Sequence, residues 1–254
     1  MTLPDTLCVA RRLPLLVPYC KQGRFSFCGT ASARPCRGQY ILFYSKIVWY
    51  LVRDPCYTGR KENDMAVNPQ TIVDALKRRG FGAYYAQTAQ DAVAQALALI
   101  PHGASVSWGG SVSVQESGLL DAVKAGDYAL IDRDMAATSA EAEDIMRRAL
   151  TADVFLTSFN AVSEDGVLYN IDGRGNRVSA IAFGAKSVVA LVGMNKIVAT
   201  EAGLEHRALS VAAPKNAKRL GKEAADICAI FVKTRMSIVP ERIKVILVGE
   251  NLGY

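Results

Sequence analysis

Apolar and polar residues alternate regularly from Met65 to the end of the chain, and the pattern switches between two periods. Apolar residues three and four positions apart predict helices, whereas short apolar runs predict buried strands. Asn68, Thr88 and Thr138 are suitable N-caps, and the two threonines each precede an acidic residue by three positions, which approximates a capping box. The predicted strands are residues 82–86, 104–107, 128–131, 153–157, 167–169, 187–192 and 243–248.

Helices are predicted between these strands, at residues 68–80, 88–100, 111–125, 138–149, 176–183 and 200–219. Pro214 is expected to kink or divide the last of them, because proline lacks the N–H that a helix interior needs. Residues 225–232 fit a helix or a strand. The continuous apolar run Ile243–Val248 is typical of a central strand in a parallel sheet. Helices that alternate with short buried strands predict an α/β fold with an open, mostly parallel, Rossmann-like sheet.

The first quarter of the chain differs from the rest in composition. Residues 1–64 carry ten of the 30 Lys and Arg residues but four of the 24 acidic ones, with five of the nine prolines and five of the six cysteines. Their net charge of +6 equals that of the whole chain, so residues 65–254 are neutral overall. Three interpretations stay open: a basic tail that docks on nucleic acid or membrane, a small extra domain, or an irregular, disordered or non-native extension before a start at Met65. We expect the α/β domain to span residues 65–254.

The cysteines and apolar runs of residues 1–64 bear on the compartment. These cysteines include no Cys-x-x-Cys pair, so the usual zinc pattern is missing and no metal site is predicted. Arg11-Arg12 precedes an apolar run that two prolines interrupt, which is not typical of a signal peptide. The run 40–52 has 13 residues and includes Lys46, whereas a membrane span needs about 20. We predict a cytoplasmic protein without a membrane partner, and we do not expect nucleic acid as a partner, because aromatic and basic residues are not interleaved there.

Four polar, glycine-bearing segments directly follow predicted strands: residues 109–111, 158–165, 193–196 and 249–251. Ligands bind beyond the carboxyl ends of the strands in open α/β sheets, so these segments are predicted to share a pocket. The Gly-Gly-Ser turn before a helix would offer free N–H groups and a hydroxyl to an anion such as phosphate or carboxylate. The predicted ligand-binding residues are Gly109, Gly110, Ser111, Asn160, Asn170, Gly173, Gly175, Asn176, Arg177 and Asn195.

Four side chains near these turns are candidates for general acid–base chemistry, namely Glu116, Asp165, Asp172 and Lys196. Each has a structural alternative. Asp165 and Asp172 precede glycines and can cap turns through their carboxylates. Arg177 or Lys196 can hold a carboxylate or phosphate, or can form an ion pair with Asp172 or Glu116. These alternatives stay open.

The sequence lacks the arrangements typical of several enzyme classes. His102 lies in a Pro-His-Gly turn and His206 on a charged helical face, so both are expected to be solvated. No Ser/His/Asp or Cys/His arrangement is predicted, which argues against nucleophilic hydrolysis. Neither the dinucleotide-binding nor the P-loop spacing is present. Cys228 lies in an apolar run and is expected to be a buried structural thiol.

Residues 65–254 resemble the lactate-utilisation (LUD) domain family, in the subgroup of LutC-type proteins. The most specific motif is Asn-Ile-Asp-Gly-Arg-Gly-Asn-Arg at residues 170–177. Residues 1–64 have no counterpart in the resemblance. The other motifs that carry it are residues 107–111, 158–161 with 164–166, 192–196, 213–217 and 243–254.

The resemblance implies a fold like ribose-5-phosphate isomerase, glucosamine-6-phosphate deaminase and CoA transferases. It also implies association with iron–sulfur and redox subunits that oxidise lactate to pyruvate. Many members of the subgroup carry a cysteine cluster before the last strand, whereas only Cys228 remains here. An iron–sulfur cluster usually requires four thiolates, so none is expected in this chain and the cofactor stays unknown.

Two functions follow from the motifs and the resemblance together. The first is an accessory subunit in the utilisation of lactate or a related hydroxy acid, which binds a small anionic metabolite. The alternative is a stand-alone enzyme that acts on a sugar phosphate or a CoA-type ligand through its carboxylate, arginine and lysine groups.

Overall fold

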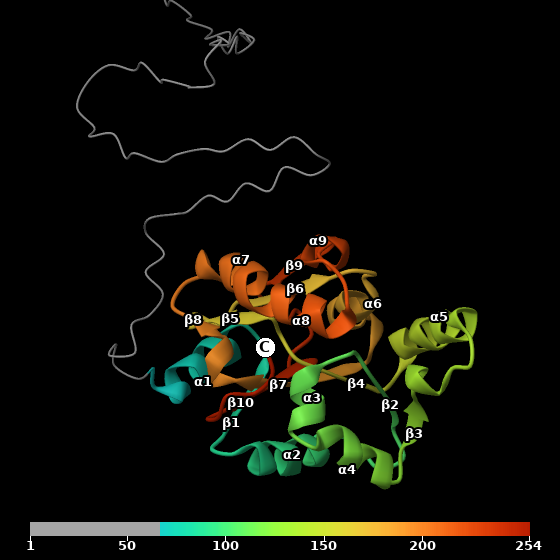
Figure 1. Ribbon diagram of the computed structural model, residues 1–254. Coiled ribbons are helices and arrows are strands. Elements are labelled where there is room, and N and C mark those ends of the chain that lie inside the picture. Colours follow the sequence, from blue (N-terminus) through green and yellow to red (C-terminus); the bar gives the residue numbers. More distant parts are fainter. Residues whose placement is uncertain (1–66) are drawn as a thin grey trace, which may run out of the picture. The chain divides into compact units, whose positions relative to one another are not determined.

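The computed structural model describes residues 67–254, so the predictions for residues 1–64 lie outside the described part of the chain. Its main sheet has six parallel strands, which confirms the predicted α/β fold with an open, mostly parallel sheet (Figure 1). The strand order is β1 (Gly82–Ala86), β10 (Ile243–Val248), β7 (Ser187–Gly193), β4 (Val154–Thr157), β2 (Ser105–Trp108) and β3 (Ala129–Ile131). β10 lies inside the sheet between β1 and β7, as its continuous apolar sequence predicted.

Three helices begin where the N-cap residues predicted: α1 (Pro69–Arg78), α2 (Ala89–Ala98) and α5 (Ser139–Arg148). The cap side chain of each accepts a hydrogen bond from a backbone N–H in the first turn, at 3.0, 3.1 and 3.2 Å respectively. These bonds satisfy N–H groups that have no partner within the helix.

The single helix predicted up to Ala125 is divided into α3 (Val112–Glu116) and α4 (Leu119–Ala125). Gly118 lies between them with a φ of 81°, a left-handed conformation that only glycine adopts without strain. An isolated glycine is also tolerated inside helices, which is why the apolar pattern alone did not reveal the break.

A second, four-stranded sheet was not predicted. Its order is β8 (Ile197–Val198), β5 (Ala161–Ser163), β6 (Leu168–Asp172) and β9 (Ile230–Thr234), and β6 is antiparallel to both of its neighbours. β5 and β8 are too short to show a period, β6 was anticipated in part, and β9 begins within the ambiguous residues 225–232. The ambiguous residues 225–232 contain most of α9 (Ala224–Ile227) and the start of β9, so neither a helix nor a strand pattern fitted them.

The last long helix contains a wider turn directly before Pro214. α7 (Gly203–Arg207), the π-helical segment η5 (Ala208–Ala212) and α8 (Ala213–Leu220) follow one another without a gap. Pro214 has no N–H to donate to the preceding turn, and the π-helical turn accommodates it without ending the helix. The remaining helical segments are α6 (Asn176–Ser179), η1 (Arg133–Met135), η2 (Ala149–Thr151), η3 (Ala180–Gly184) and η4 (Met194–Lys196).

Side chains of the main sheet alternate between its two faces, and each face is buried by different elements. Val189 and Leu191 of β7 pack with side chains of α2, α3 and α4, whereas Val188 and Val192 pack with α1 and with β5 and β6. Leu204 of α7 covers the other face of β5 and β6. The described residues therefore form four layers (Figure 1). These are the helices α2 to α4, the main sheet, α1 with the second sheet, and the C-terminal helix, by which we mean the continuous helix α7–η5–α8.

None of the helices within residues 67–254 is long and apolar enough to cross a membrane. The apolar run 40–52 lies outside the described residues.

Gly166 fits the turn between β5 and β6 closely against α1. Its φ is 88°, and a Cβ at this position would lie 2.9 Å from the carbonyl carbon of Ala75. Gly118 has a similar φ of 81° but no heavy atom within 4 Å of such a Cβ. An alanine at Gly118 would therefore add backbone strain alone, whereas an alanine at Gly166 would add the same strain and a steric clash.

We expect Gly118→Ala to lower the free energy of unfolding by about 1–2 kcal/mol, the strain of a left-handed residue with a side chain. Gly166→Ala should lower it by roughly 1–3 kcal/mol more, because α1 must move to admit the methyl group. Denaturant unfolding of both variants and the parent protein measures the difference. Equal losses in the two variants would contradict the close contact between this turn and α1.

Candidate functional site

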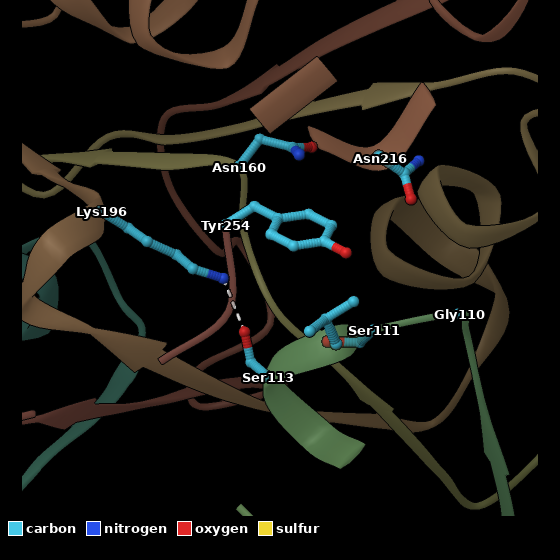
Figure 2. A pocket seen from close by; sticks show the side chains of 8 residues that line it. Gly110, Ser111, Ser113, Asn160, Lys196, Asn216 and Tyr254 are labelled. Carbon is cyan, nitrogen blue, oxygen red and sulfur yellow. Dashed lines mark hydrogen bonds between the residues drawn. The ribbon is translucent and has the colours of Figure 1, made fainter. Parts of the chain in front are cut away.

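A small cavity of about 50 Å³ lies beyond the carboxyl ends of the main-sheet strands (Figure 2). Its walls come from the segments that follow β2, β4, β7 and β10, with a contribution from α8. Three of the four predicted polar segments contribute directly, and the fourth continues to Tyr254. The lining residues are Gly110, Ser111, Val112, Ser113, Asn160, Lys196, Asn216 and Tyr254.

Lys196 is the buried amine of this cavity. It lies in η4, directly after β7, and is only 3% exposed. Its Nζ donates hydrogen bonds to Ser113 Oγ at 2.6 Å and to Ser158 Oγ at 3.0 Å. These two serines follow β2 and β4, so the amine connects three strand ends.

The surroundings of Lys196 favour the neutral amine. Burial is the main cause that lowers its pKa to about 7, because a charged ammonium group loses its hydration there. The positive charges of Arg207 and Arg177 lower the pKa further, and the negative charge of Glu116 opposes them. A lysine in this state can act as a base or as a nucleophile near neutral pH.

Arg207, at the end of α7, connects the loops around the cavity. Its guanidinium donates to the carbonyl of Asn195 at 2.9 and 3.2 Å, to the carbonyl of Asn160, and to that of Tyr254 at 3.4 Å. It is 5% exposed, although the helix that carries it reads as charged in the sequence. Arg207 therefore fixes three cavity segments without lining the cavity.

Asn195, a predicted ligand residue, also joins two of these segments. Its side-chain amide donates to the Gly253 carbonyl at 3.1 Å, and its Oδ1 accepts from the Leu252 N–H at 3.1 Å. The segment after β7 is thus tied to the segment after β10.

Arg177 contacts the side chain of the lining residue Asn160, and Asp172 in turn contacts Arg177. The Arg177 guanidinium donates to Asn160 Oδ1 at 3.2 Å and to the carbonyl of Ile171, and its Nε lies 3.9 Å from Asp172 Oδ2. The ion pair considered from the sequence is therefore present. Asp172 also accepts the backbone N–H groups of Arg177 and Val178 at 3.1 and 3.2 Å, so it caps α6. Both side chains orient the lining and do not belong to it.

The other residues of the 170–177 motif shape the same support. Asn170 is 2% exposed and donates to the Ser158 carbonyl at 3.3 Å. Asn176 begins α6. Gly175 has a φ of 86°, and a Cβ there would lie 2.8 Å from the Ile230 side chain. A Cβ on Gly173 would be less crowded, at 3.4 Å from the carbonyl oxygen of Ile227 in α9.

The turn after β2 differs from the expected anion cradle. The Gly109 N–H donates to the Leu156 carbonyl at 3.3 Å, and the Ser111 N–H donates to the Gly109 carbonyl at 2.8 Å. The prediction of free N–H groups is therefore wrong for Gly109 and Ser111, because the sheet ladder and the turn itself use them. The Ser111 hydroxyl oxygen, by contrast, is buried and has no hydrogen-bond partner among the described residues.

Two further guanidinium groups lie beside Gly110. A Cβ on Gly110 would lie 3.0 Å from Arg133 Nη2 and 3.6 Å from Arg219 Nη2. Arg219 is held by Asn216 Oδ1 at 2.9 and 3.2 Å, and Asn216 lines the cavity. The Gly110 side of the cavity therefore carries two guanidinium groups.

Two further predicted acid–base residues, Asp165 and Glu116, lie outside the lining, as Asp172 does. Asp165 pairs with Arg79 at 2.6 Å and accepts from the Ser163 hydroxyl at 2.5 Å. Burial alone would raise the pKa of Asp165, but these two partners together hold it below its usual range. Glu116 Oε2 accepts the Gly253 N–H at 2.8 Å. Asp165 thus stabilises a turn, and Glu116 anchors the last residues of the chain beside the cavity.

Several cavity residues were not singled out from the sequence. Ser113, Asn216, Tyr254 and the supporting Arg207 have no turn or motif spacing of their own, although Asn216 and Tyr254 fall within segments that carry the family resemblance. The missing information is tertiary, because each side chain gains its role from a segment far away in the sequence.

The described residues do not fit an iron–sulfur cluster. Cys228 is the one cysteine among residues 67–254, and such a cluster usually takes four thiolates. Cys228 packs against the cluster around Leu204, and burial raises the pKa of its thiol. Within these residues no group of three His, Cys, Asp or Glu side chains is placed to hold a metal ion.

Comparison with known proteins places the chain beside one family and several solved structures. The LUD domain family matches residues 70–248. No match was found among curated proteins. The chain is similar to a DUF162 family protein from Deinococcus radiodurans, with 20% identity and a TM-score of 0.45 over 70% of this chain and 94% of that one.

Two other solved structures share less with the chain. For eIF2B beta from Chaetomium thermophilum the identity is 15% and the TM-score 0.32, over 44% of this chain and 43% of that chain. For ribose 5-phosphate isomerase from Plasmodium falciparum the values are 16% and 0.27, over 42% and 51%.

The low pKa of Lys196 predicts how stability depends on pH. Folding moves this pKa from 10.5 to about 7, so between these values the unfolded chain binds a proton that the folded protein does not bind. Stability therefore rises with pH across this window, by up to about 1.4 kcal/mol per pH unit. Lys196→Met removes the contribution, whereas Lys186→Met, at a side chain 75% exposed, keeps it.

From pH 7.5 to pH 9, we expect the free energy of unfolding of the parent protein and of Lys186→Met to rise by roughly 1–2 kcal/mol more than that of Lys196→Met. Denaturant unfolding at the two pH values measures this difference. The same change with pH in all three proteins would contradict the low pKa.

Proposed function

This chain belongs to the LUD domain family, which relates it to lactate utilisation in general, and on that premise we propose that its cavity binds a small carboxylate anion. The protein would act as a LutC-like accessory subunit in the oxidation of lactate or a related hydroxy acid to pyruvate. The observation that carries the proposal is a cavity of about 50 Å³ with Lys196 on one side, two guanidinium groups beside Gly110, and a Ser111 hydroxyl that has no hydrogen-bond partner among the described residues.

The charge of the surroundings supports an anionic ligand. Lys196 lies on one side, and Arg133 and Arg219 approach the Gly110 side. Guanidinium groups bind carboxylates through paired, charge-assisted hydrogen bonds. The nearby acids are already engaged, since Asp172 caps α6 and Glu116 accepts the Gly253 N–H.

The size of the cavity supports a small ligand. A single water needs about 10–15 Å³ of such space, so about 50 Å³ admits on the order of four water-sized groups. An acid the size of lactate fits this space with modest adjustment of the side chains. A sugar phosphate or a CoA ester would not fit as a whole, although its acidic group could enter.

The runner-up function, a stand-alone enzyme, is favoured by one specific observation. Lys196 has the low pKa and the hydroxyl neighbours that catalytic lysines use. In that case the chain would transform the bound anion itself instead of serving partner subunits.

Ser111→Ala tests the ligand site most cleanly. Because the hydroxyl has no hydrogen-bond partner within residues 67–254, its loss should leave the stability unchanged or raise it by up to about 1 kcal/mol. Binding of lactate should weaken by roughly three- to tenfold, the value of one hydrogen bond. Ser139→Ala, on the exposed first turn of α5, is the matched control.

The measurement is the rise in melting temperature of the full chain with lactate, pyruvate, phosphate, a sugar phosphate and a CoA ester. Saturating ligand, at a hundred times its Kd, adds about 2.7 kcal/mol to the folded state. No shift with any of the small acids would overturn the proposed ligand class. A shift confined to the sugar phosphate or the CoA ester would favour the runner-up.

The accessory role predicts a complex with redox subunits. The tagged full chain, isolated from its native host without harsh salt, is expected to carry iron–sulfur or other redox proteins identified by mass spectrometry. A mock-tagged strain is the control. Recovery of the chain alone, at physiological salt and from cells grown on lactate, would contradict the accessory role and leave the ligand class standing.

A further inference from the structure

The two hydrogen bonds of Lys196 use both N–H groups of its neutral amine. Ser158 Oγ donates to the Leu191 carbonyl at 2.6 Å, and Ser113 Oγ donates to the Leu252 carbonyl at 3.3 Å. Each hydroxyl has one proton, so both oxygens can only accept from Lys196 Nζ. The amine is therefore anchored by two N–H donors to two fixed acceptors.

A neutral amine held in this way has one remaining tetrahedral position, which carries its lone pair. Among the described residues no carboxylate lies within ion-pair distance of Nζ, and the two serine bonds are its hydrogen bonds. Lys196 lines the cavity, so its amine borders that space (Figure 2). The geometry is that of a nucleophile presented to a small ligand and not of a cation in a salt bridge.

We propose that Lys196 Nζ adds to the carbonyl carbon of a small 2-oxo acid in this cavity and forms an imine. This inference rests on the proposed carboxylate site and specifies its ligand as an acid with a carbonyl next to the carboxylate. The carbonyl would lie at the Lys196 end, and the carboxylate would lie toward Gly110, beside Arg133 and Arg219. Figure 2 shows Lys196 and Gly110 on opposite sides of the cavity.

The reaction needs no oxidant and no further reactant. The nitrogen lone pair forms a bond to the carbonyl carbon, and the C=O π electrons move to the oxygen, which takes one of the two amine protons. The resulting carbinolamine loses this hydroxyl group with the second amine proton as water, and a C=N bond forms. Ser113 and Ser158 accept the two N–H groups, so either serine passes a proton only when its own hydroxyl leaves its carbonyl acceptor.

The state of the amine supports the step. Burial holds the pKa of Lys196 at about 7, with Arg207 and Arg177 acting in the same direction and Glu116 against it. Near pH 7.5 most of this amine is unprotonated, whereas an ordinary lysine is unprotonated to about 0.1%. Lys196 should therefore react roughly a few hundred times faster than an exposed lysine.

The test is reductive trapping on the full chain. Pyruvate is added at pH 7.5 with sodium borohydride, which reduces an imine to a stable secondary amine, and the adduct is counted by intact mass and located by peptide mapping. We expect one adduct per chain, at Lys196. It should be absent in Lys196→Met and present in Lys186→Met, where an exposed lysine is replaced.

The location of the adduct in the parent protein decides the inference even if Lys196→Met does not fold. Adducts spread over exposed lysines, or no adduct at all, would overturn it. Lactate separates this failure from failure of the proposed function, because it carries a hydroxyl in place of the carbonyl and cannot form an imine. If lactate and pyruvate raise the melting temperature and no adduct forms, the imine is wrong and the carboxylate site stands; if neither acid binds, both are wrong.

Discussion

The buried amine of Lys196 is the constraint on which the arrangement of the strand ends depends. A lysine that is 3% exposed keeps its place only if its nitrogen finds hydrogen-bond partners, and here these are Ser113 and Ser158. The two serines belong to the segments after β2 and β4, while Lys196 follows β7. The amine therefore sets the spacing of three neighbouring segments and, through them, the size of the cavity.

The layers of the fold make this burial possible. Helices α2 to α4 cover one face of the main sheet, and α1 with the second sheet covers the other, so the strand ends open into a space that the C-terminal helix closes. Arg207 fastens that helix to the carbonyl groups of Asn195, Asn160 and Tyr254. The π-helical turn that follows lets the helix continue past Pro214 and bring Asn216 to the cavity. Helix, loops and amine thus form one connected unit.

The sequence predicted the elements whose signals are local. The N-caps Asn68, Thr88 and Thr138 and the apolar run of β10 depend on neighbouring residues, and the structure confirms each of them. The strands β5 and β8 have three and two residues, so they are too short to show a local period. The same division holds at the site, where strand-end topology indicated Gly110, Ser111, Asn160 and Lys196. It could not indicate that Asp165 is drawn to Arg79, because that pairing joins segments 86 residues apart.

The most direct test of the central claim is the titration of the lysine side chains by NMR, with carbon-13 at the Cε positions and with Lys196→Met to assign the signal. We expect a lysine signal that titrates near pH 7 and is absent from the variant. A Lys196 signal that titrates near the ordinary lysine value of about 10.4 would contradict this expectation, since the amine would then be a charged, hydrated group and the cavity an ordinary surface cleft.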